Sequence, residues 1–305
     1  MKRNTNKLVS IIIPTYKGNT FLKRAINSAL SQSYSNIEVI VVDDNNPDTQ
    51  DRLETERVMG AFIDNPMVRY IKHEKNKNGS AARNTGVKNS KGEYLAFLDD
   101  DDELLPSKIE SMVSRLEDLP LEWGAAYSNY EVIRPNGQRL HYGEKKEGAL
   151  LKDALMRNLM IAAGSNLLVR KSVFNELNGF DESFKRNQDL EFLVRLLKEY
   201  KIAYVDNLGL IVHQQIKISH ADFKELTNKY LETFDEAIKT FPDKEQCQIK
   251  TMLCLQVFRY DFFRKKIHGA FNVIKDNKVS LLLAARYLFH LMGRYFTKSI
   301  KGFDL

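Results

Sequence analysis

Short runs of apolar, largely β-branched residues alternate with helix-like segments through the first hundred residues, and this alternation restricts the possible fold more than any other feature. Such runs are typical of strands buried on both faces of a sheet. They cover Leu8–Ile13 and Ile37–Val42, and two further strands are expected over Met67–Lys72 and Glu93–Leu98. Helices are expected between them, the first with Thr20 as its N-cap and the others over Asp51–Ile63 and Ser80–Lys88. Strands and helices in this order predict a doubly wound α/β fold with a parallel sheet.

Polar clusters follow three of these strands directly. Pro14, Thr15 and Tyr16 follow the first run, Asp43-Asp44-Asn45 follows the second, and four consecutive aspartates from Asp99 to Asp102 follow the last. In parallel sheets, ligands bind beyond the carboxyl ends of the strands. We therefore expect the active site where these three clusters meet.

The second half of the chain is less regular. We expect a strand over Trp123–Tyr130, a turn over Arg134–Gln138, an amphipathic helix over Asn187–Tyr200 and a strand over Leu208–Val212. Beyond about Ser219 the pattern is helical and indicates three helices. The sequence therefore predicts a catalytic domain over residues 1–219 and a basic helical subdomain over residues 220–305.

Positive charge is concentrated in that tail. The chain has a formal net charge of +6, but residues 244–305 contain twelve Lys and Arg residues against four Asp and Glu residues. The net charge of the tail is thus +8, and that of the rest of the chain is −2. Because the excess positive charge lies in the tail, we expect it to bear on docking or assembly and not on the chemistry of the catalytic domain. Its last segment mixes apolar residues such as Leu282 and Phe289 with Arg286 and Arg294. Two explanations stay open: contact with an anionic membrane surface, or packing on the catalytic domain or in a homo-oligomer.

The remaining composition indicates a cytoplasmic globular protein, either free or peripheral at the inner face of the cell membrane. Cys247 and Cys254 lie on one expected helix, where a disulfide between them is geometrically implausible. The N-terminus has no apolar signal segment, and no apolar run approaches the roughly 18 residues of a membrane helix. No nucleic-acid-binding motif accompanies the positive charge, so we expect no nucleic-acid partner.

The four aspartates from Asp99 to Asp102 would repel one another unless a cation or a hydrogen-bonding ligand sits among them. Mg²⁺ and Mn²⁺ are typically held by one or two carboxylates and completed by substrate phosphates and water. A solvated acidic loop is the alternative, and the spacing excludes an EF-hand. Asp44 stands where nucleotide-binding sheets bind ribose or base. Because no G-x-G-x-x-G follows the first strand, a diphosphate would need another clamp, which a metal on the aspartates would supply.

Five sequence blocks occur in the order and at the spacing of a known family. They are Val9–Tyr16, Ser31–Tyr34, Glu38–Asp44, Asn78–Gly86 and Gly92–Asp102. Together they resemble the family-two glycosyltransferases with the GT-A fold, which include bacterial enzymes of capsule, exopolysaccharide and O-antigen synthesis. The resemblance covers residues 8 to about 215.

The resemblance implies roles for residues in the first half of the chain. Pro14, Thr15 and Tyr16 resemble the loop that holds the nucleotide base, and Asp44 resembles the carboxylate that reads uracil. Arg83 resembles the cation near the base or diphosphate, with a helix-surface cation as the alternative. Asp99, Asp101 and Asp102 resemble the D-x-D-D signature: the first two approach ribose and sugar, and Asp101 and Asp102 approach the metal, Mn²⁺ or Mg²⁺. Asp100 occupies the variable position and is expected to be dispensable.

Two further residues are assigned by the same resemblance. Asp189 resembles the catalytic base of the family's E-D motif, with Gln188 where Glu is usual. A favourable partner of the helix dipole is the alternative reading of Asp189. His213 resembles the C-terminal histidine that often ligates the metal, with a structural histidine as the alternative.

The resemblance implies an inverting, metal-dependent transfer of a sugar from a UDP-sugar to an acceptor hydroxyl, on a lipid-linked or growing glycan. A nucleotide-sugar-binding homologue without catalysis is one alternative, against which the intact Asp189 argues. A sugar nucleotidyltransferase is another, but that class is expected to carry a Gly-rich basic loop after the first strand, where this chain has Pro14-Thr15-Tyr16-Lys17-Gly18.

Overall fold

The computed structural model describes residues 6–17, 19–184, 187–215 and 223–305, and these form two compact units. Unit 1 comprises the chain up to His141 together with Lys145–Ala149 and Ile161–Gln214. Unit 2 comprises Tyr142–Glu144, Leu150–Met160 and Gln215–Leu305. The expected domain boundary at 219/220 lies outside the described residues and stays a prediction.

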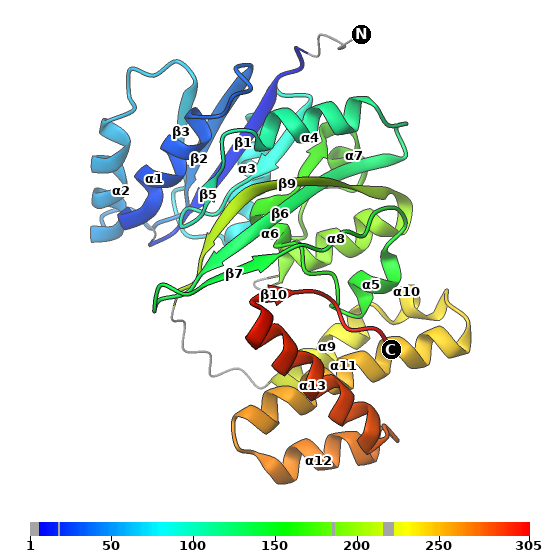
Figure 1. The fold of residues 1–305 in the computed structure, drawn as a ribbon. Coiled ribbons are helices and arrows are strands. Elements are labelled where there is room, and N and C mark those ends of the chain that lie inside the picture. Colours follow the sequence, from blue (N-terminus) through cyan, green and yellow to red (C-terminus); the bar gives the residue numbers. More distant parts are fainter. Residues whose placement is uncertain (1–5, 18, 185–186, 216–222) are drawn as a thin grey trace. The chain divides into compact units, whose positions relative to one another are not determined.

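Unit 1 begins with a parallel α/β arrangement, shown in blue and cyan in Figure 1. Strand β1 pairs in parallel with β2 and β4, and β2 pairs in parallel with β3. These strands are β1 (Val9–Thr15), β2 (Ile37–Asp43), β3 (Val68–Lys72) and β4 (Tyr94–Phe97). Three helices return the chain between them, α1 (Asn19–Leu30), α2 (Gln50–Gly60) and α3 (Gly79–Lys88). The predicted α/β class is confirmed.

The sheet continues as a mixed sheet on the other side of β4. The order β7-β6-β8-β4-β1-β2-β3 runs across it, and β9 pairs in parallel with β6 and antiparallel with β5. Strand β8 is antiparallel to both β4 and β6. The added strands are β5 (Glu103–Leu104), β6 (Trp123–Ile133), β7 (Arg139–Tyr142), β8 (Leu168–Arg170) and β9 (Lys201–His213). Strand β9 starts well before the expected Leu208, because exposed residues such as Asp206 interrupt its apolar pattern.

Within the described part of unit 1 the further helices are α4 (Lys108–Glu117), α6 (Ala163–Asn166), α7 (Lys171–Glu176) and α8 (Gln188–Glu199). An aromatic cluster packs α7 and α8 against β4. Phe97, Phe174, Phe180 and Phe192 are buried, and their contacting ring centroids lie 4.9–5.6 Å apart. This cluster fixes the first turn of α8, which carries Asp189, relative to the carboxyl end of β4.

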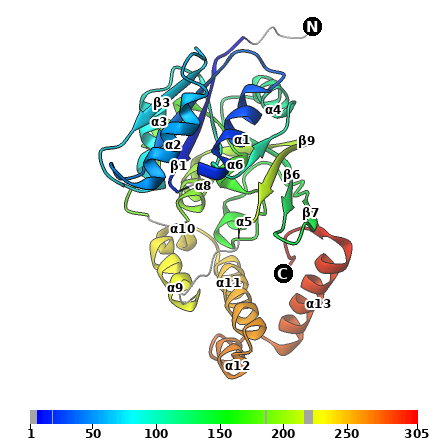
Figure 2. The same ribbon diagram turned by 90° about the vertical axis from the view of Figure 1, so that its left-hand side faces the viewer.

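Unit 2 contains more helices than the sequence pattern indicates. Besides α5 (Leu151–Leu155), it has α9 (Phe223–Thr233), α10 (Asp235–Lys239), α11 (Asp243–Phe263), α12 (Ile267–Asp276) and α13 (Leu281–Thr297), followed by β10 (Ser299–Ile300). The prediction of three helices is wrong, because the breaks between the observed helices are too short to interrupt the apolar periodicity. Figure 2 shows α13 separating from α11 as it leaves α12.

Three smaller expectations are also settled. Helix α1 begins at Asn19, so the prediction of Thr20 as its N-cap is wrong and Thr20 lies in the first turn. Cys247 and Cys254 both lie on α11 and are free, as predicted. Among the described helices, none combines the length and apolar character that crossing a bilayer requires.

Candidate active site

Two carboxylates face the same small space beside α6. A Cβ added to Gly164 would lie 3.3 Å from Asp99 Oδ2 and 3.8 Å from Asp189 Oδ2. Asp99 follows β4, and Asp189 lies in the first turn of α8, where Asn187 adopts a left-handed conformation (φ 57°). Burial raises the pKa of Asp189, and the nearby Arg83 guanidinium opposes this shift. A carboxylate so placed can take a proton near neutral pH more readily than an exposed aspartate.

Arg83 contacts one of these two carboxylates, that of Asp99. It is buried, and its Nη2 donates to Asp99 Oδ1 at 2.5 Å. A Cβ added to Gly79 would lie 2.9 Å from Arg83 Nη1 and 3.1 Å from Gln188 Nε2, so Gln188 stands beside the guanidinium. The alternative reading of Arg83 as a helix-surface cation is therefore wrong.

The acidic cluster gathers three of its four carboxylates. Asp99, Asp101 and Asp102 each offer one oxygen, and these oxygens lie within 4.8 Å of one another. Ser165 Oγ donates to Asp102 Oδ2 at 2.6 Å and accepts from the Asp99 N–H at 3.0 Å. Burial and the charge of Asp99 raise the pKa of Asp102. Three oxygen donors at this spacing fit a hard divalent cation such as Mg²⁺ or Mn²⁺.

His213 lies next to this cluster, and its ring contacts another residue. Its backbone N–H donates to Asp102 Oδ1 at 3.1 Å, while its Nε2 lies 2.5 Å from Glu103 Oε1. The grouped ligand atoms of the three aspartates do not include a ring nitrogen of His213. A contact of Nε2 with a carboxylate is nevertheless what a metal-bound histidine commonly makes through its second ring nitrogen. The metal role of His213 stays a prediction, with the structural alternative beside it.

Asp100 points away from the other three aspartates toward the first loop. Thr15 Oγ1 donates to Asp100 Oδ2 at 2.5 Å, and burial raises the pKa of Asp100 to about 7. Pro14 and Thr15 are the last residues of β1, and the exposed Tyr16 follows with the Lys17 ammonium 5.2 Å from its ring centroid. Asp100 therefore holds the expected base-binding loop, which argues against its being dispensable.

Asp44 is surrounded by hydrogen-bond donors. Its Oδ1 lies 2.7 Å from His73 Nδ1 and accepts from the Lys77 N–H at 2.8 Å. Its Oδ2 accepts from Asn76 Nδ2 at 2.8 Å and from the Asn78 N–H at 2.9 Å. With the side chain this saturated and 2% of the residue exposed, a uracil ring could reach the carboxylate only by displacing one of these donors. The uracil-reading role of Asp44 stays a prediction.

Sequence reasoning missed three residues of this site: His73, Gly164 and Ser165. His73 is buried, and its second ring nitrogen lies 2.9 Å from Thr85 Oγ1. Gly164 and Ser165 occupy a four-residue helix after Ala162, which is left-handed at φ 50°. The one available signal was the run of small residues at 162–166, which shows no periodicity.

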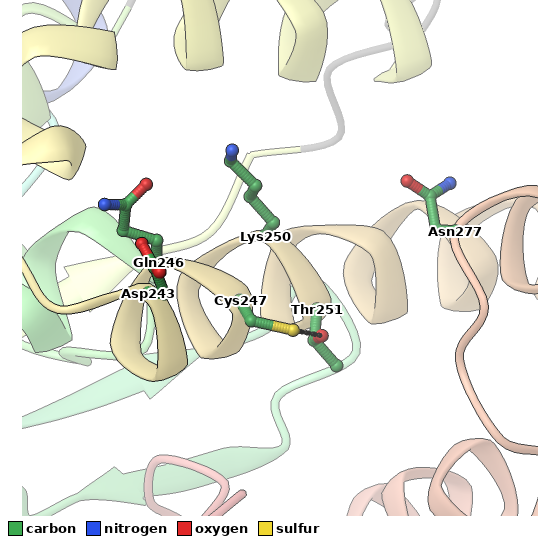
Figure 3. A pocket seen from close by; sticks show the side chains of 6 residues that line it. All are labelled: Asp243, Gln246, Cys247, Lys250, Thr251 and Asn277. Atoms are coloured by element: carbon green, nitrogen blue, oxygen red, sulfur yellow. Dashed lines mark hydrogen bonds between the residues drawn. The ribbon is translucent and has the colours of Figure 1, made fainter.

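A separate pocket of about 290 Å³ opens in unit 2 (Figure 3). It is lined by Asp243, Gln246, Cys247, Lys250, Thr251 and Asn277. Figure 3 shows the Lys250 side chain pointing away from the Cys247–Thr251 pair, so the polar groups do not converge on one point. We assign no chemistry to this pocket.

Comparison with known families decides the class of the chain. Residues 10–177 match the model of glycosyl transferase family 2. The chain belongs to this family. The resemblance found in the sequence is thereby confirmed, and the gathered aspartates lie within the matched region.

Similar proteins and structures agree with this assignment. An uncharacterized glycosyltransferase of Rickettsia bellii is 36% identical over 209 residues, which are 67% of this chain and 29% of that protein. The Escherichia coli UDP-Glc:alpha-D-GlcNAc-diphosphoundecaprenol beta-1,3-glucosyltransferase WfgD is 30% identical over 73% of this chain and 84% of its own length. The crystal structure of S. aureus TarS 1-349 superposes with a TM-score of 0.61 at 17% identity, covering 83% of this chain and 72% of TarS 1-349. The same TarS fragment in complex with UDP-GlcNAc gives a TM-score of 0.59.

These matches support a GT-A-like fold for unit 1. The chain spans about a third of the length of the first Rickettsia relatives it matches. The activity, substrates and partners of the whole protein are therefore proposals, which follow.

Proposed function

We propose that this family member transfers a sugar from a UDP-sugar to a hydroxyl of an acceptor glycan, with inversion at the anomeric carbon. The convergence of Asp99 and Asp189 on Gly164, with Arg83 bound to Asp99, carries this proposal. The arrangement offers a cation and a carboxylate for the donor on one side, and a second carboxylate for the acceptor on the other.

Asp189 is the base in this proposal. The acceptor oxygen attacks the anomeric carbon, the bond from that carbon to the UDP oxygen breaks, and the hydroxyl proton passes to Asp189 Oδ2. The raised pKa of Asp189 suits this role, because a carboxylate with a higher pKa holds the transferred proton more firmly. The aromatic cluster, which includes Phe192 of α8, holds the helix that carries this carboxylate.

The donor side of the proposal uses Tyr16, Arg83 and the three gathered aspartates. In this proposal the exposed Tyr16 ring offers a face for the base, and Arg83 would bind ribose or diphosphate oxygens. Asp99, Asp101 and Asp102 would hold Mn²⁺ or Mg²⁺, which when bound would offset the negative charge of the departing UDP. Ser165 and the His213 backbone keep Asp102 aligned for that task.

The donor and acceptor classes draw on the similar proteins. WfgD is named for UDP-Glc and a lipid-diphosphate-linked sugar, and TarS was crystallised with UDP-GlcNAc. We therefore propose a UDP-hexose or UDP-N-acetylhexosamine as the donor, and a lipid-linked or growing surface glycan as the acceptor.

A UDP-release assay tests the proposal. The full chain is incubated with Mn²⁺, UDP-Glc or UDP-GlcNAc, and synthetic lipid-diphosphate sugars. We expect UDP release that depends on both donor and acceptor. Calorimetric UDP binding without release from any donor and acceptor pair would support a non-catalytic homologue instead. Pyrophosphate production from UTP and a sugar phosphate would support a nucleotidyltransferase.

The metal assignment has its own test in UDP binding. Asp102→Ala is expected to weaken Mn²⁺-dependent UDP binding about 10–100-fold in calorimetry. The exposed Asp64→Ala serves as the matched control and should bind like the unchanged protein. Equal UDP affinity of Asp102→Ala and Asp64→Ala would refute the metal role of Asp102.

A further inference from the structure

Helix α13 presents an uncovered apolar side to solvent. Its inner side is buried, with the Tyr287 and Phe303 ring centroids 5.1 Å apart. On the opposite side Leu282, Phe289 and Phe296 recur every seven residues and are 76%, 70% and 74% exposed. With the exposed Met292, these residues form what we call the α13 outer face. A helix that is apolar on both sides is normally covered on both, and an exposed apolar patch marks an interaction site.

A second apolar cluster occurs at the turn between α11 and α12. Phe263, Ile267 and Phe271 are exposed and are spaced four residues apart, and Arg264, Lys265 and Lys266 lie between the first two. We call residues 263–271 the α11–α12 turn. The Arg264 guanidinium lies 4.5 Å from the Tyr260 ring centroid, which places a cation beside this apolar cluster.

Both features belong to a strongly cationic stretch. Residues 264–301 contain nine Lys and Arg residues and a single acidic residue, Asp276. Helix α13 itself has no Asp or Glu, and its charged residues are Arg286 and Arg294. An ordinary solvated helix would carry both signs of charge on its outer side, so this composition requires an explanation.

A second copy of the chain or a lipid bilayer could cover the α13 outer face and the α11–α12 turn, and the distribution of charge favours the bilayer. A symmetric contact with a second copy would bring the same cations together across the interface, with almost no carboxylate nearby to pair with them. An anionic bilayer complements both features at once, since its headgroups attract Lys and Arg and its acyl boundary accepts Leu, Phe and Met.

We propose that the α13 outer face and the α11–α12 turn rest on the surface of an anionic lipid bilayer. In this arrangement α13 lies in the plane of the interface with its apolar side chains among the acyl chains. Lys265 and Lys266 contact the headgroup phosphates. Arg286, whose guanidinium lies 5.7 Å from the Phe303 ring centroid and donates to the Asp304 carbonyl, adds positive charge beside them. The proposal does not depend on the sugar transfer, because vesicle binding can be measured without turnover.

Vesicle flotation of the full chain tests this surface. We expect the protein to float with phosphatidylcholine vesicles containing about 30% phosphatidylglycerol, and much less with phosphatidylcholine alone or at 0.5 M NaCl. Replacing Lys265, Lys266 and Arg286 with Gln should weaken binding to the anionic vesicles roughly 100-fold. The matched control replaces the exposed Lys23, Lys88 and Lys198 of unit 1 with Gln and should bind like the unchanged protein.

The apolar half of the proposal needs a second variant pair. Leu282→Ser, Phe289→Ser and Phe296→Ser together should weaken vesicle binding more than about 10-fold. The control changes the exposed Leu53, Ile63 and Leu121 of unit 1 to Ser. Circular dichroism and UDP calorimetry verify that both variants keep their fold.

Three results would overturn the proposal. The first is a lack of binding to anionic vesicles at low salt. The second is equal binding by the α13 variant and its unit 1 control. The third is a combination of two observations. The unchanged protein forms a dimer in analytical ultracentrifugation and does not bind vesicles, whereas the α13 variant is a monomer; this would assign the α13 outer face to contact with a second copy.

Discussion

The substitution Gly164→Ala separates stability from catalysis at the candidate active site. The φ angle of Gly164 is not among the positive values, and the residue lies in α6, so alanine suits its backbone. Replacing a helical Gly with Ala typically adds about 0.4–1 kcal/mol of stability when the new Cβ has room. Here the Cβ would lie 3.3 Å from Asp99 Oδ2, so the carboxylate must move by a few tenths of an ångström. We expect the free energy of unfolding to stay within about 1 kcal/mol of that of the unchanged protein.

Catalysis should respond far more strongly to the same methyl group. It fills the space between Asp99 and Asp189, where the donor sugar and the acceptor hydroxyl must meet in the proposed reaction. Misplacement of reacting groups by about 1 Å costs on the order of 100-fold in rate, so we expect a shift of a few tenths of an ångström to lower the rate of UDP release roughly 10-fold.

The matched control is Gly60→Ala. Gly60 ends helix α2, and a Cβ added there meets nothing within 4 Å. The rate of UDP release by Gly60→Ala should match that of the unchanged protein. Its melting temperature should be equal to that of the unchanged protein or slightly higher. Turnover of Gly164→Ala within a few-fold of the Gly60→Ala control would refute the placement of the reaction beside Gly164.

Three further predictions follow from the buried polar groups. His73→Leu removes one of the two partners of Asp44 Oδ1 and should lower the free energy of unfolding by about 1–3 kcal/mol in urea titrations; unchanged stability would show that the contact with Asp44 is incidental. The acid limb of the rate should lie above the ordinary aspartate range near pH 4, because the raised pKa of Asp189 must be exceeded before the base is free. Arg83→Gln should move that limb to higher pH, since the guanidinium favours the charged carboxylate, and a shift to lower pH would contradict the assignment. Lys108 is buried, and its ammonium donates to Ser128 and Asn166, with no carboxylate partner among the described residues. Burial lowers its pKa to about 7 from 10.5. Because the unfolded chain holds that proton up to about pH 10, the stability of the protein relative to Lys108→Met should rise between pH 7 and 10, by up to about 1.4 kcal/mol per pH unit, and a flat difference would refute the burial cost.

Strands β1, β2 and β4 of the parallel half could be predicted because each is a largely apolar run followed closely by a polar residue. Burial on both faces leaves such a run few alternatives, as in β1 and β2. Strand β9 was only partly predictable, since its middle carries exposed polar residues and its pairing with β6 is irregular. The helices of unit 2 were undercounted because their breaks, such as the one at Lys278 with φ 54°, leave the apolar spacing nearly intact.

Some residues of the candidate active site could likewise be predicted from the sequence, and others could not. The aspartates after β4 and Asp189 stood out from sequence, because charged residues at strand and helix ends are conspicuous. The partners of Asp44 did not, since they lie on the 73–78 segment, which the pairing of β2 with β3 brings to that carboxylate. Gly164 matters through the absence of a side chain, which becomes visible only once Asp99 and Asp189 are placed on either side of it.

The role of Asp189 as the base is the central claim, and Asp189→Asn tests it most directly. UDP release with Mn²⁺, donor and acceptor should fall by about 10²–10⁴-fold, because the amide cannot take the hydroxyl proton. Calorimetry of the same variant with UDP and Mn²⁺ should give a Kd within a few-fold of that of the unchanged protein, since the proposed donor contacts lie on other residues. Turnover by Asp189→Asn at a rate close to that of the unchanged protein would contradict the account.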